Sequence, residues 1–242
     1  MVSGDRLLRI LGRLTSGQGP GLGTARLCAV CADVTSMSGA GIMLMSGDLP
    51  KGSVCTTNGV SEIIEQLQYT LGEGPCVDAV RQHRAVLEPD LARPATPRWV
   101  AFTPPAVRAG ARAIFGFPLD VGAVRLGALN LYRDRPGPLT DDQHADALVL
   151  ASVAARAVIG MQADADPGAL GAELEVGTNF QFAVHQASGM VSVQLGVSVG
   201  QALVRLRANA FADDRLVADV AREVISGRLR FDHRDGQARS GR

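Results

Sequence analysis

The feature that most constrains the fold is a change of hydrophobic period beyond the middle of the chain. Up to about residue 162, helical spacing alternates with short apolar runs of strand length, whereas from residue 179 onwards only helical spacing occurs. Residues 163–178 between these parts hold four acids, no basic residue, a proline and several glycines. We therefore expect two folding units joined by an acidic linker or connecting helix.

The first expected unit, residues 1–162, combines helices with strands. Helices are predicted over residues 21–35 and 61–70, and short apolar strands over 40–47 and 52–57. The second of these helices carries its apolar residues on one face: Ile63, Ile64, Leu67 and Leu71.

The later part of this unit predicts a hairpin and a closing helix. Residues 111–119 and 124–132 have the length and composition of strands, and the glycine between them permits an antiparallel turn. Thr140 and Gln143 form a capping-box pattern that opens a helix running to about residue 162. Helices around a central antiparallel sheet make an α+β domain.

The second expected unit, residues 179–226, is a small all-α bundle. A wide apolar face runs through residues 179–195 until Gly196, Ser198 is placed to cap the next helix, and Asp213 or Asp214 to cap a third that ends at Gly227. Three short helices with apolar stripes bury them most simply against one another. Residues 227–242 are polar and basic and are predicted to be a flexible tail.

Composition excludes several classes of protein. With 46% apolar and 20% charged residues the chain can bury a core, and its zero net charge argues against coating nucleic acid non-specifically. No run approaches the roughly 18 apolar residues of a membrane helix. Asp5 and Arg6 interrupt the region where an export signal needs apolar residues. We expect a cytoplasmic protein with no membrane partner.

Four cysteines in such a chain do not suggest a disulfide framework. Cys28 and Cys31 lie in a predicted helix, and buried thiols are the favoured interpretation, with a metal or redox site as the alternative. Cys76 follows a Gly-Glu-Gly-Pro turn; inward packing is favoured there over an oxidant-sensing thiol. The histidines and cysteines match no catalytic or metal-binding signature, so we predict no catalytic residue, no metal and no enzyme.

Residues 180–226 resemble an ANTAR domain, the RNA-binding module of bacterial antitermination regulators. The resemblance is carried by the following residues: Ala187, Gly189, Met190, Ala202, Leu206, Arg207, Ala210, Leu216, Val220 and Ala221. It implies a three-helix bundle that binds paired hairpins in mRNA leaders. Gln181 and Ser188 are uncharged where the family has Arg and Lys, which predicts weaker RNA binding.

The arginines of this segment are the candidate RNA contacts, because a guanidinium suits phosphates and base edges. Arg207 and Arg215 are predicted as principal contacts, Arg205 and Arg222 as further ones, and Ser188 as a motif position facing RNA. The alternative is that these arginines pair with nearby acids: Asp213, Asp214, Asp219 and Glu223.

Residues 22–162 resemble a GAF domain of the kind that precedes ANTAR domains in actinobacteria. The matching motifs are residues 71–78 (LGEGPCVD), the pair Arg98 and Trp99, residues 117–119 (FPL) and residues 127–131 (GALNL). The resemblance implies a sheet that encloses an unidentified small ligand and dimerisation through terminal helices. The expected ligand-binding residues are Ile63, Leu67, Phe115 and Phe117, with Cys76 at the rim.

Two functions remain open at this stage. The first is an antitermination regulator whose GAF domain controls an RNA-binding ANTAR domain. The second is a dimeric GAF module whose helical segment does not bind RNA. A homodimer is expected in both cases, since the helix over 141–162 and the N-terminal residues each carry an apolar stripe. The N-terminal stripe consists of Leu7, Leu8, Ile10, Leu11 and Leu14.

Overall fold

The computed structural model describes residues 2–15, 24–47, 49–163, 179–213, 215–232 and 238–240. The chain divides into two compact units, Met1–Leu170 and Gly171–Arg242. The expected linker, residues 163–178, lies outside the described residues except for Ala163, the last residue of helix α6 (Asp141–Ala163).

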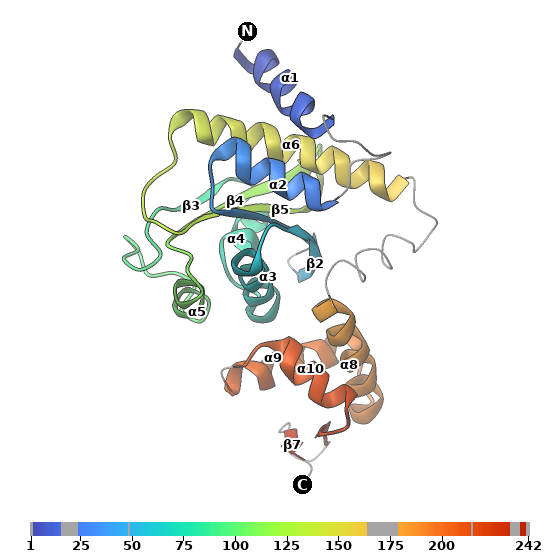
Figure 1. Ribbon diagram of the computed structural model, residues 1–242. Coiled ribbons are helices and arrows are strands. Elements are labelled where there is room, and N and C mark those ends of the chain that lie inside the picture. Colours follow the sequence, from blue (N-terminus) through green and yellow to red (C-terminus); the bar gives the residue numbers. More distant parts are fainter. Residues whose placement is uncertain are drawn as a thin grey trace. The chain divides into compact units, whose positions relative to one another are not determined.

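A five-stranded antiparallel sheet forms the centre of the first unit (Figure 1). In sheet order its strands are β2 (Leu49–Thr56), β1 (Gly39–Ser46), β5 (Val124–Arg133), β4 (Ala113–Val121) and β3 (Val86–Glu88). The predicted hairpin is confirmed as β4 and β5, which close with Val121 opposite Val124. The α+β architecture expected from the alternating periods is therefore present.

Helices cover both faces of this sheet (Figure 1). Helix α2 (Thr24–Thr35) and α6 lie on one face, and α3 (Gly59–Leu71) and α4 (Pro75–Gln82) lie on the other. Helix α1 (Val2–Thr15) packs against α2 and α6, and α5 (Thr103–Arg108) contacts α3.

Local sequence signals explain where the long helices begin. The Gln143 main-chain N–H donates to Thr140 Oγ1 over 3.2 Å, and the Thr140 N–H donates to Gln143 Oε1 over 3.0 Å, so the predicted capping box of α6 is formed. Asn58 and Ser61 form a second capping box at the start of α3. The short elements α4, β3 and α5 were not predicted, because three to eight residues are too few to establish a period.

The second unit contains three helices at the predicted places: α8 (Asn179–Leu195), α9 (Val199–Ala212) and α10 (Val217–Ile225). Helix α8 packs against both of the others. Ser198 caps α9 as predicted, because its hydroxyl accepts from the Gln201 N–H and the Gln201 side chain accepts in return. The residues that fill the interior of this unit are mostly small or branched: Val184, Ala187, Val191, Ala202, Leu206, Ala210, Val217, Val220, Ala221 and Val224.

Two expectations for the second unit are corrected. The N-cap of α10 is Leu216, without a side-chain hydrogen bond, whereas Asp213 ends α9; Asp214 lies outside the described residues. The predicted flexible tail instead begins with strand β6 (Leu229–Phe231), which pairs with β7 (Ala238–Ser240). Burial of Leu229 and Phe231, with a 2.9 Å hydrogen bond from the Phe231 N–H to Gln194 Oε1, holds β6 against α8.

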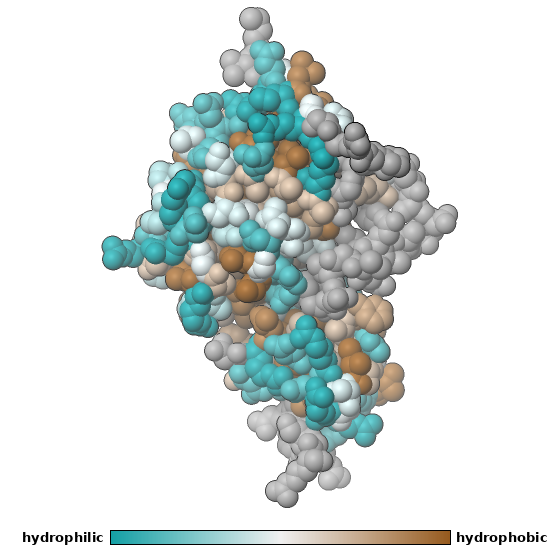
Figure 2. Space-filling view, in the orientation of Figure 1, coloured by the Kyte–Doolittle hydropathy of each residue, from teal (hydrophilic) through white to brown (hydrophobic). Residues whose placement is uncertain are grey.

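Among the described residues, one helix is long and apolar enough to cross a membrane, namely Asp141–Met161 of α6; α8 and α9 meet that test only as a pair bent by 104°. The inner residues of α6 are buried against β4 and α2, as in a core helix, whereas Leu148 and Ile159 are exposed. On the face shown in Figure 2, hydrophilic residues cover much of the surface and hydrophobic residues form smaller patches within it.

Candidate functional site

The candidate site of the first unit starts from one row of residues across the sheet. Asn130 of β5 lies directly opposite Gly41 of β1 and, on its other side, opposite Gly116 of β4. Residues paired in this way point to the same face of a sheet. A polar side chain thus stands between two glycines on the face covered by α3 and α4.

The two glycines let groups from the covering helices approach the sheet. A Cβ on Gly41 would lie 2.6 Å from Glu65 Oε1, and a Cβ on Gly116 would lie 2.5 Å from the main-chain oxygen of Pro75. Helix α3 therefore brings the Glu65 carboxyl to the sheet, and the first turn of α4 takes the place of a side chain at Gly116.

Glu65 is fully buried in this row and accepts a 2.6 Å hydrogen bond from Asn130 Nδ2. Burial disfavours the charged form and raises the pKa of Glu65 to about 8, an effect that the Asn130 hydrogen bond opposes. The carboxyl is consequently neutral between the ordinary glutamate pKa and a pH of about 8, where an exposed glutamate is ionised.

Gln68, one turn after Glu65, holds the start of α4. Its Oε1 accepts a 2.7 Å hydrogen bond from the main-chain N–H of Cys76. The N-cap residue of α4, Gly74, supplies no side-chain acceptor, so Gln68 of α3 performs that role from outside the helix.

Cys76 completes the buried polar cluster. Its thiol is fully buried, close to the Glu65 carboxyl and the Asn130 side chain that influence its pKa. Burial, and next the Glu65 carboxyl, raise the pKa of the Cys76 thiol well above its usual value. The inward packing predicted for Cys76 is confirmed, and a thiol of this kind is a poor nucleophile at neutral pH.

Three side chains of the cluster retain unused hydrogen-bonding capacity. Glu65 Oε2, Gln68 Nε2 and Asn130 Oδ1 are buried and have no hydrogen-bond partner among the described residues. Leaving such groups unsatisfied costs about 1–3 kcal/mol each. They present a donor and acceptors suited to a small polar molecule.

Two acidic residues of the motif at residues 71–78 form hydrogen bonds beside the cluster. Glu73 Oε1 accepts from the main-chain N–H groups of Ala101 and Phe102, over 2.7 and 2.8 Å. Asp78 Oδ2 accepts from the Trp99 indole over 2.9 Å. These hydrogen bonds join residues 98–102 to residues 71–78, which include the start of α4.

The structure does not bring the predicted ligand-binding residues together. Phe117 contacts His144 of α6, with ring centroids 5.6 Å apart, and Phe115 lies two residues away on the same face of β4. Leu67 and Cys76 belong to the helices on the opposite face. Strand alternation places odd-numbered residues of β4 towards α6, so Phe115 and Phe117 are core residues on the α2/α6 side. Ile63 is only half-buried.

Sequence reasoning missed the residues that do come together: Glu65, Gln68 and Asn130. A signal existed, because Glu65 and Gln68 interrupt the apolar face of their helix, and Asn130 interrupts an apolar strand. A polar residue on an otherwise apolar face indicates a buried hydrogen-bonding group.

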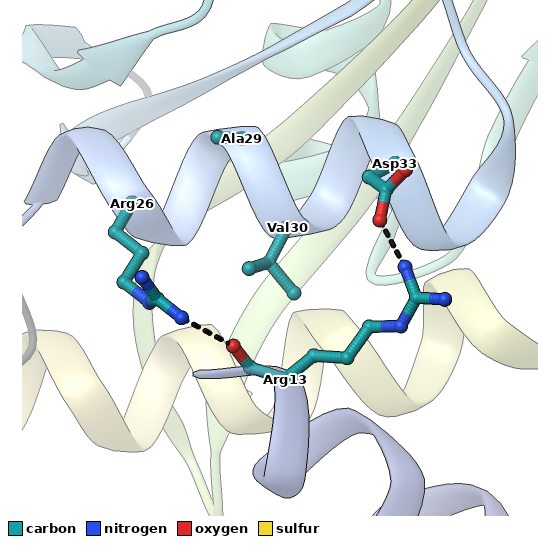
Figure 3. Close-up of a pocket in the computed structure, with 5 residues that line it drawn as sticks. All are labelled: Arg13, Arg26, Ala29, Val30 and Asp33. Carbon is teal, nitrogen blue, oxygen red and sulfur yellow. Dashed lines mark hydrogen bonds and ion pairs between the residues drawn. The ribbon is translucent and has the colours of Figure 1, made fainter. Parts of the chain in front are cut away.

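A separate hollow of about 430 Å³ lies where α1 meets α2 (Figure 3). It is lined by Arg13, Arg26, Ala29, Val30 and Asp33, and contains none of the predicted ligand-binding residues. Its charged groups bind one another, since Arg13 pairs with Asp33 and Arg26 Nη2 donates to the Arg13 main-chain oxygen over 2.8 Å. We therefore interpret this hollow as the packing junction of α1 and α2 and not as the candidate ligand site.

The arginines of the second unit differ in their surroundings. Arg215 pairs with Glu223 over 2.8 Å, and Arg222 pairs with Asp219 over 2.5 Å. Arg205 is exposed on α9, and Arg207 is half-buried. The alternative of pairing with nearby acids therefore holds for Arg215 and Arg222.

Ser188 is not a surface position. It is 1% exposed, and its hydroxyl donates to the Val184 main-chain oxygen over 2.7 Å. The prediction that Ser188 faces RNA is thus wrong for this structure, because α8 turns that side towards the other helices. The side chain of Gln181 lies outside the described residues.

The first unit therefore defines a class of protein: an α+β domain with a polar cluster between its sheet and two covering helices. Residues 24–159, more than half of the chain, match the GAF domain family model, and the chain belongs to that family. No curated protein matches the chain in sequence.

Solved structures with a similar fold are distant in sequence. The GAF domain of an Acinetobacter phosphoenolpyruvate-protein phosphotransferase is 14% identical, covering 67% of this chain and 96% of its own, with a TM-score of 0.49. The free methionine-R-sulfoxide reductase of Neisseria meningitidis, in complex with its substrate, is 15% identical, covering 66% of this chain and 90% of its own, with a TM-score of 0.47.

Proposed function

We propose that this chain is a cytoplasmic transcription antitermination regulator, in which the GAF unit senses a small ligand and controls an ANTAR unit that binds mRNA hairpins. The observation that carries the proposal is the position of the ANTAR-like residues. Ala187, Ala202, Leu206, Ala210 and Ala221 are all fully buried in the second unit. The resemblance thus concerns the residues that determine how three helices pack.

The outer side of α9 supports RNA as the partner. Arg205 is exposed there, and Phe211 is 62% exposed near the end of the same helix. An arginine and an aromatic side chain are the groups that bind phosphates and stack on the unpaired bases of RNA loops. Arg207, two residues after Arg205, is the remaining candidate on α9.

A specific observation favours the second candidate function, a dimeric GAF module whose helical unit does not bind RNA. The ion pairs Arg215–Glu223 and Arg222–Asp219 neutralise two of the four arginines that the resemblance offers to RNA. Each phosphate contact contributes separately to affinity, so a reduced set of arginines predicts weak binding.

Replacing Arg205 and Arg207 together with alanine is expected to weaken binding to a two-hairpin RNA by about tenfold at physiological salt, and to lower the slope of log affinity against log salt by about 0.7–0.9 per lost contact. A mobility shift at several salt concentrations measures both. The double variant Arg215→Ala, Arg222→Ala is the control, because it removes an equal charge from two arginines that pair with Glu223 and Asp219. Absence of salt-sensitive RNA binding by the unaltered protein would favour the dimeric module.

The GAF unit is proposed to bind its ligand at the cluster of Glu65, Gln68 and Asn130. Each of these side chains has a buried polar atom without a hydrogen-bond partner among the described residues. An uncharged polar molecule fits this cluster best, since the raised pKa keeps Glu65 protonated at neutral pH. A neutral carboxyl can donate one hydrogen bond and accept others.

We also propose that the protein is a homodimer formed through its terminal helices. Leu7, Leu8 and Leu11 of α1 are 38%, 69% and 39% exposed, while Ile10 and Leu14 are buried against the unit. Leu148 and Ile159 of α6 are likewise exposed. A second copy would remove these leucines from water.

Leu8→Glu is therefore expected to convert the dimer to a monomer at micromolar concentration, because it puts a charge into an apolar contact. Sedimentation equilibrium measures the mass. Val124→Glu is the matched control, since Val124 is 56% exposed at the tip of the β4–β5 hairpin. A monomeric unaltered protein would refute the dimer.

A further inference from the structure

Cys28 of α2 and Cys55 of β2 form a disulfide, with their Cα atoms 6.0 Å apart. This corrects the expectation that the cysteines are free thiols. The β1–β2 hairpin returns Cys55 to a position beside α2, 27 residues along the chain, which no local spacing reveals. Because β2 is an edge strand, the bond attaches α2 to the border of the sheet.

Disulfides are rare in the cytoplasm, where those that occur are mostly catalytic or redox-sensing. We propose that the Cys28–Cys55 disulfide is a redox-responsive element of the GAF unit, and that its reduction by a dithiol releases α2 from β2 and loosens the α1–α2–α6 layer. This inference rests on the proposed function, which places the chain in the cytoplasm.

The reaction transfers two electrons and two protons. A thiolate of the dithiol attacks one sulfur of the Cys28–Cys55 bond and the other cysteine leaves as a thiolate, which then takes a proton. The second thiol of the reductant attacks the mixed disulfide, so the products are Cys28 thiol, Cys55 thiol and an oxidised dithiol. Cys28 is fully buried and Cys55 is 6% exposed, so both products are neutral thiols of the kind that protein interiors accommodate.

Cys31, one helical turn after Cys28, does not compete with the external reductant. It is a buried free thiol, and burial raises its pKa to about 12. The attacking species in exchange is the thiolate, which is scarce for Cys31 at neutral pH. The state of the Cys28–Cys55 pair is therefore set by reductants and oxidants from outside the unit.

Helix α2 connects the disulfide to both terminal helices of the unit. Arg26 Nε donates to the Leu14 main-chain oxygen of α1 over 3.0 Å, and Arg13 of α1 pairs with Asp33 (Figure 3). At the other end, Gln143 Nε2 of α6 donates to the Thr35 main-chain oxygen over 3.0 Å. Displacement of α2 thus acts on α1 and on α6, the last described helix before the second unit.

Amide hydrogen exchange of the full chain, oxidised and after treatment with dithiothreitol, tests this directly. We expect exchange in α1, α2, β2 and the start of α6 to accelerate at least about tenfold on reduction, while β4 and β5 keep their protection. The Cys28→Ser, Cys55→Ser double variant should exchange like the reduced protein without any reductant. Cys31→Ser is the control and should respond like the unaltered protein.

Equal exchange in α2 before and after complete reduction, verified by alkylation and mass spectrometry, would overturn the inference. So would a loosening spread evenly over the whole unit. Reduction of the unaltered protein keeps the test decisive if the double variant does not fold. RNA binding is measured on the same samples: its absence in every state refutes the proposed antitermination function, whereas the exchange result alone decides the redox response.

Discussion

Glu65→Gln is expected to stabilise the GAF unit at pH 8 and to change its stability little at pH 5. The pKa of Glu65 is raised to about 8, above the value of a glutamate in an unfolded chain, because burial disfavours the carboxylate. The folded state therefore binds this proton more tightly. The contribution of Glu65 is intact below the ordinary carboxyl range and is lost as the pH rises towards 8.

Glutamine avoids this loss because it has no proton to release. Its side-chain oxygen can still accept the hydrogen bond that Asn130 Nδ2 donates to Glu65, so the change of shape is small. A pKa difference corresponds to about 1.4 kcal/mol per unit, so the variant should gain up to about 4 kcal/mol over the unaltered protein between pH 5 and pH 8. Urea denaturation at both pH values measures the gain.

Two comparisons make this result specific. Glu62→Gln, on the exposed side of the same helix, removes an equal charge and should show no such growth with pH. The Cys76 thiol does not mimic the effect, since its pKa is raised above its usual value and it remains neutral over this range. A Glu65→Gln effect of equal size at pH 5 and pH 8 would mean that Glu65 is ionised in the folded state.

Gly116→Ala is expected to destabilise the GAF unit by about 1–3 kcal/mol, the usual cost of overpacking. The new methyl group would lie 2.5 Å from the Pro75 carbonyl oxygen and 2.8 Å from its carbon. These are main-chain atoms at the start of α4, so relief requires the helix to move. That movement would also disturb the hydrogen bond from the Cys76 N–H to Gln68.

Gly160→Ala is the matched control for this prediction. Gly160 lies in α6, and a Cβ there would meet nothing within 4 Å. Alanine in a helix is favoured over glycine by up to about 1 kcal/mol, so this variant should be slightly more stable than the unaltered protein. Thermal or urea unfolding distinguishes the two. A Gly116→Ala protein as stable as the unaltered one would show that α4 is not seated on the sheet at this point.

The sequence by itself determined the elements that depend on neighbours along the chain. The alternation of the β4–β5 hairpin, the Thr140–Gln143 capping box and the Ser198 cap were all predictable, because each depends on residues a few positions apart. The helical period after residue 179 likewise predicted three helices. The motif residues 71–78 predicted a turn after α3, although neither helix α4 nor what the turn contacts.

Tertiary structure alone decided which residues meet. The assignment of Phe115 and Phe117 to the cavity failed because the sequence does not say which face of β4 receives which helices. The polar cluster depends on the register that sets Asn130 between Gly41 and Gly116, and the disulfide depends on a hairpin that returns Cys55 to α2. These contacts join residues far apart in sequence, and strand register and helix packing, which no local pattern encodes, bring them within bonding distance.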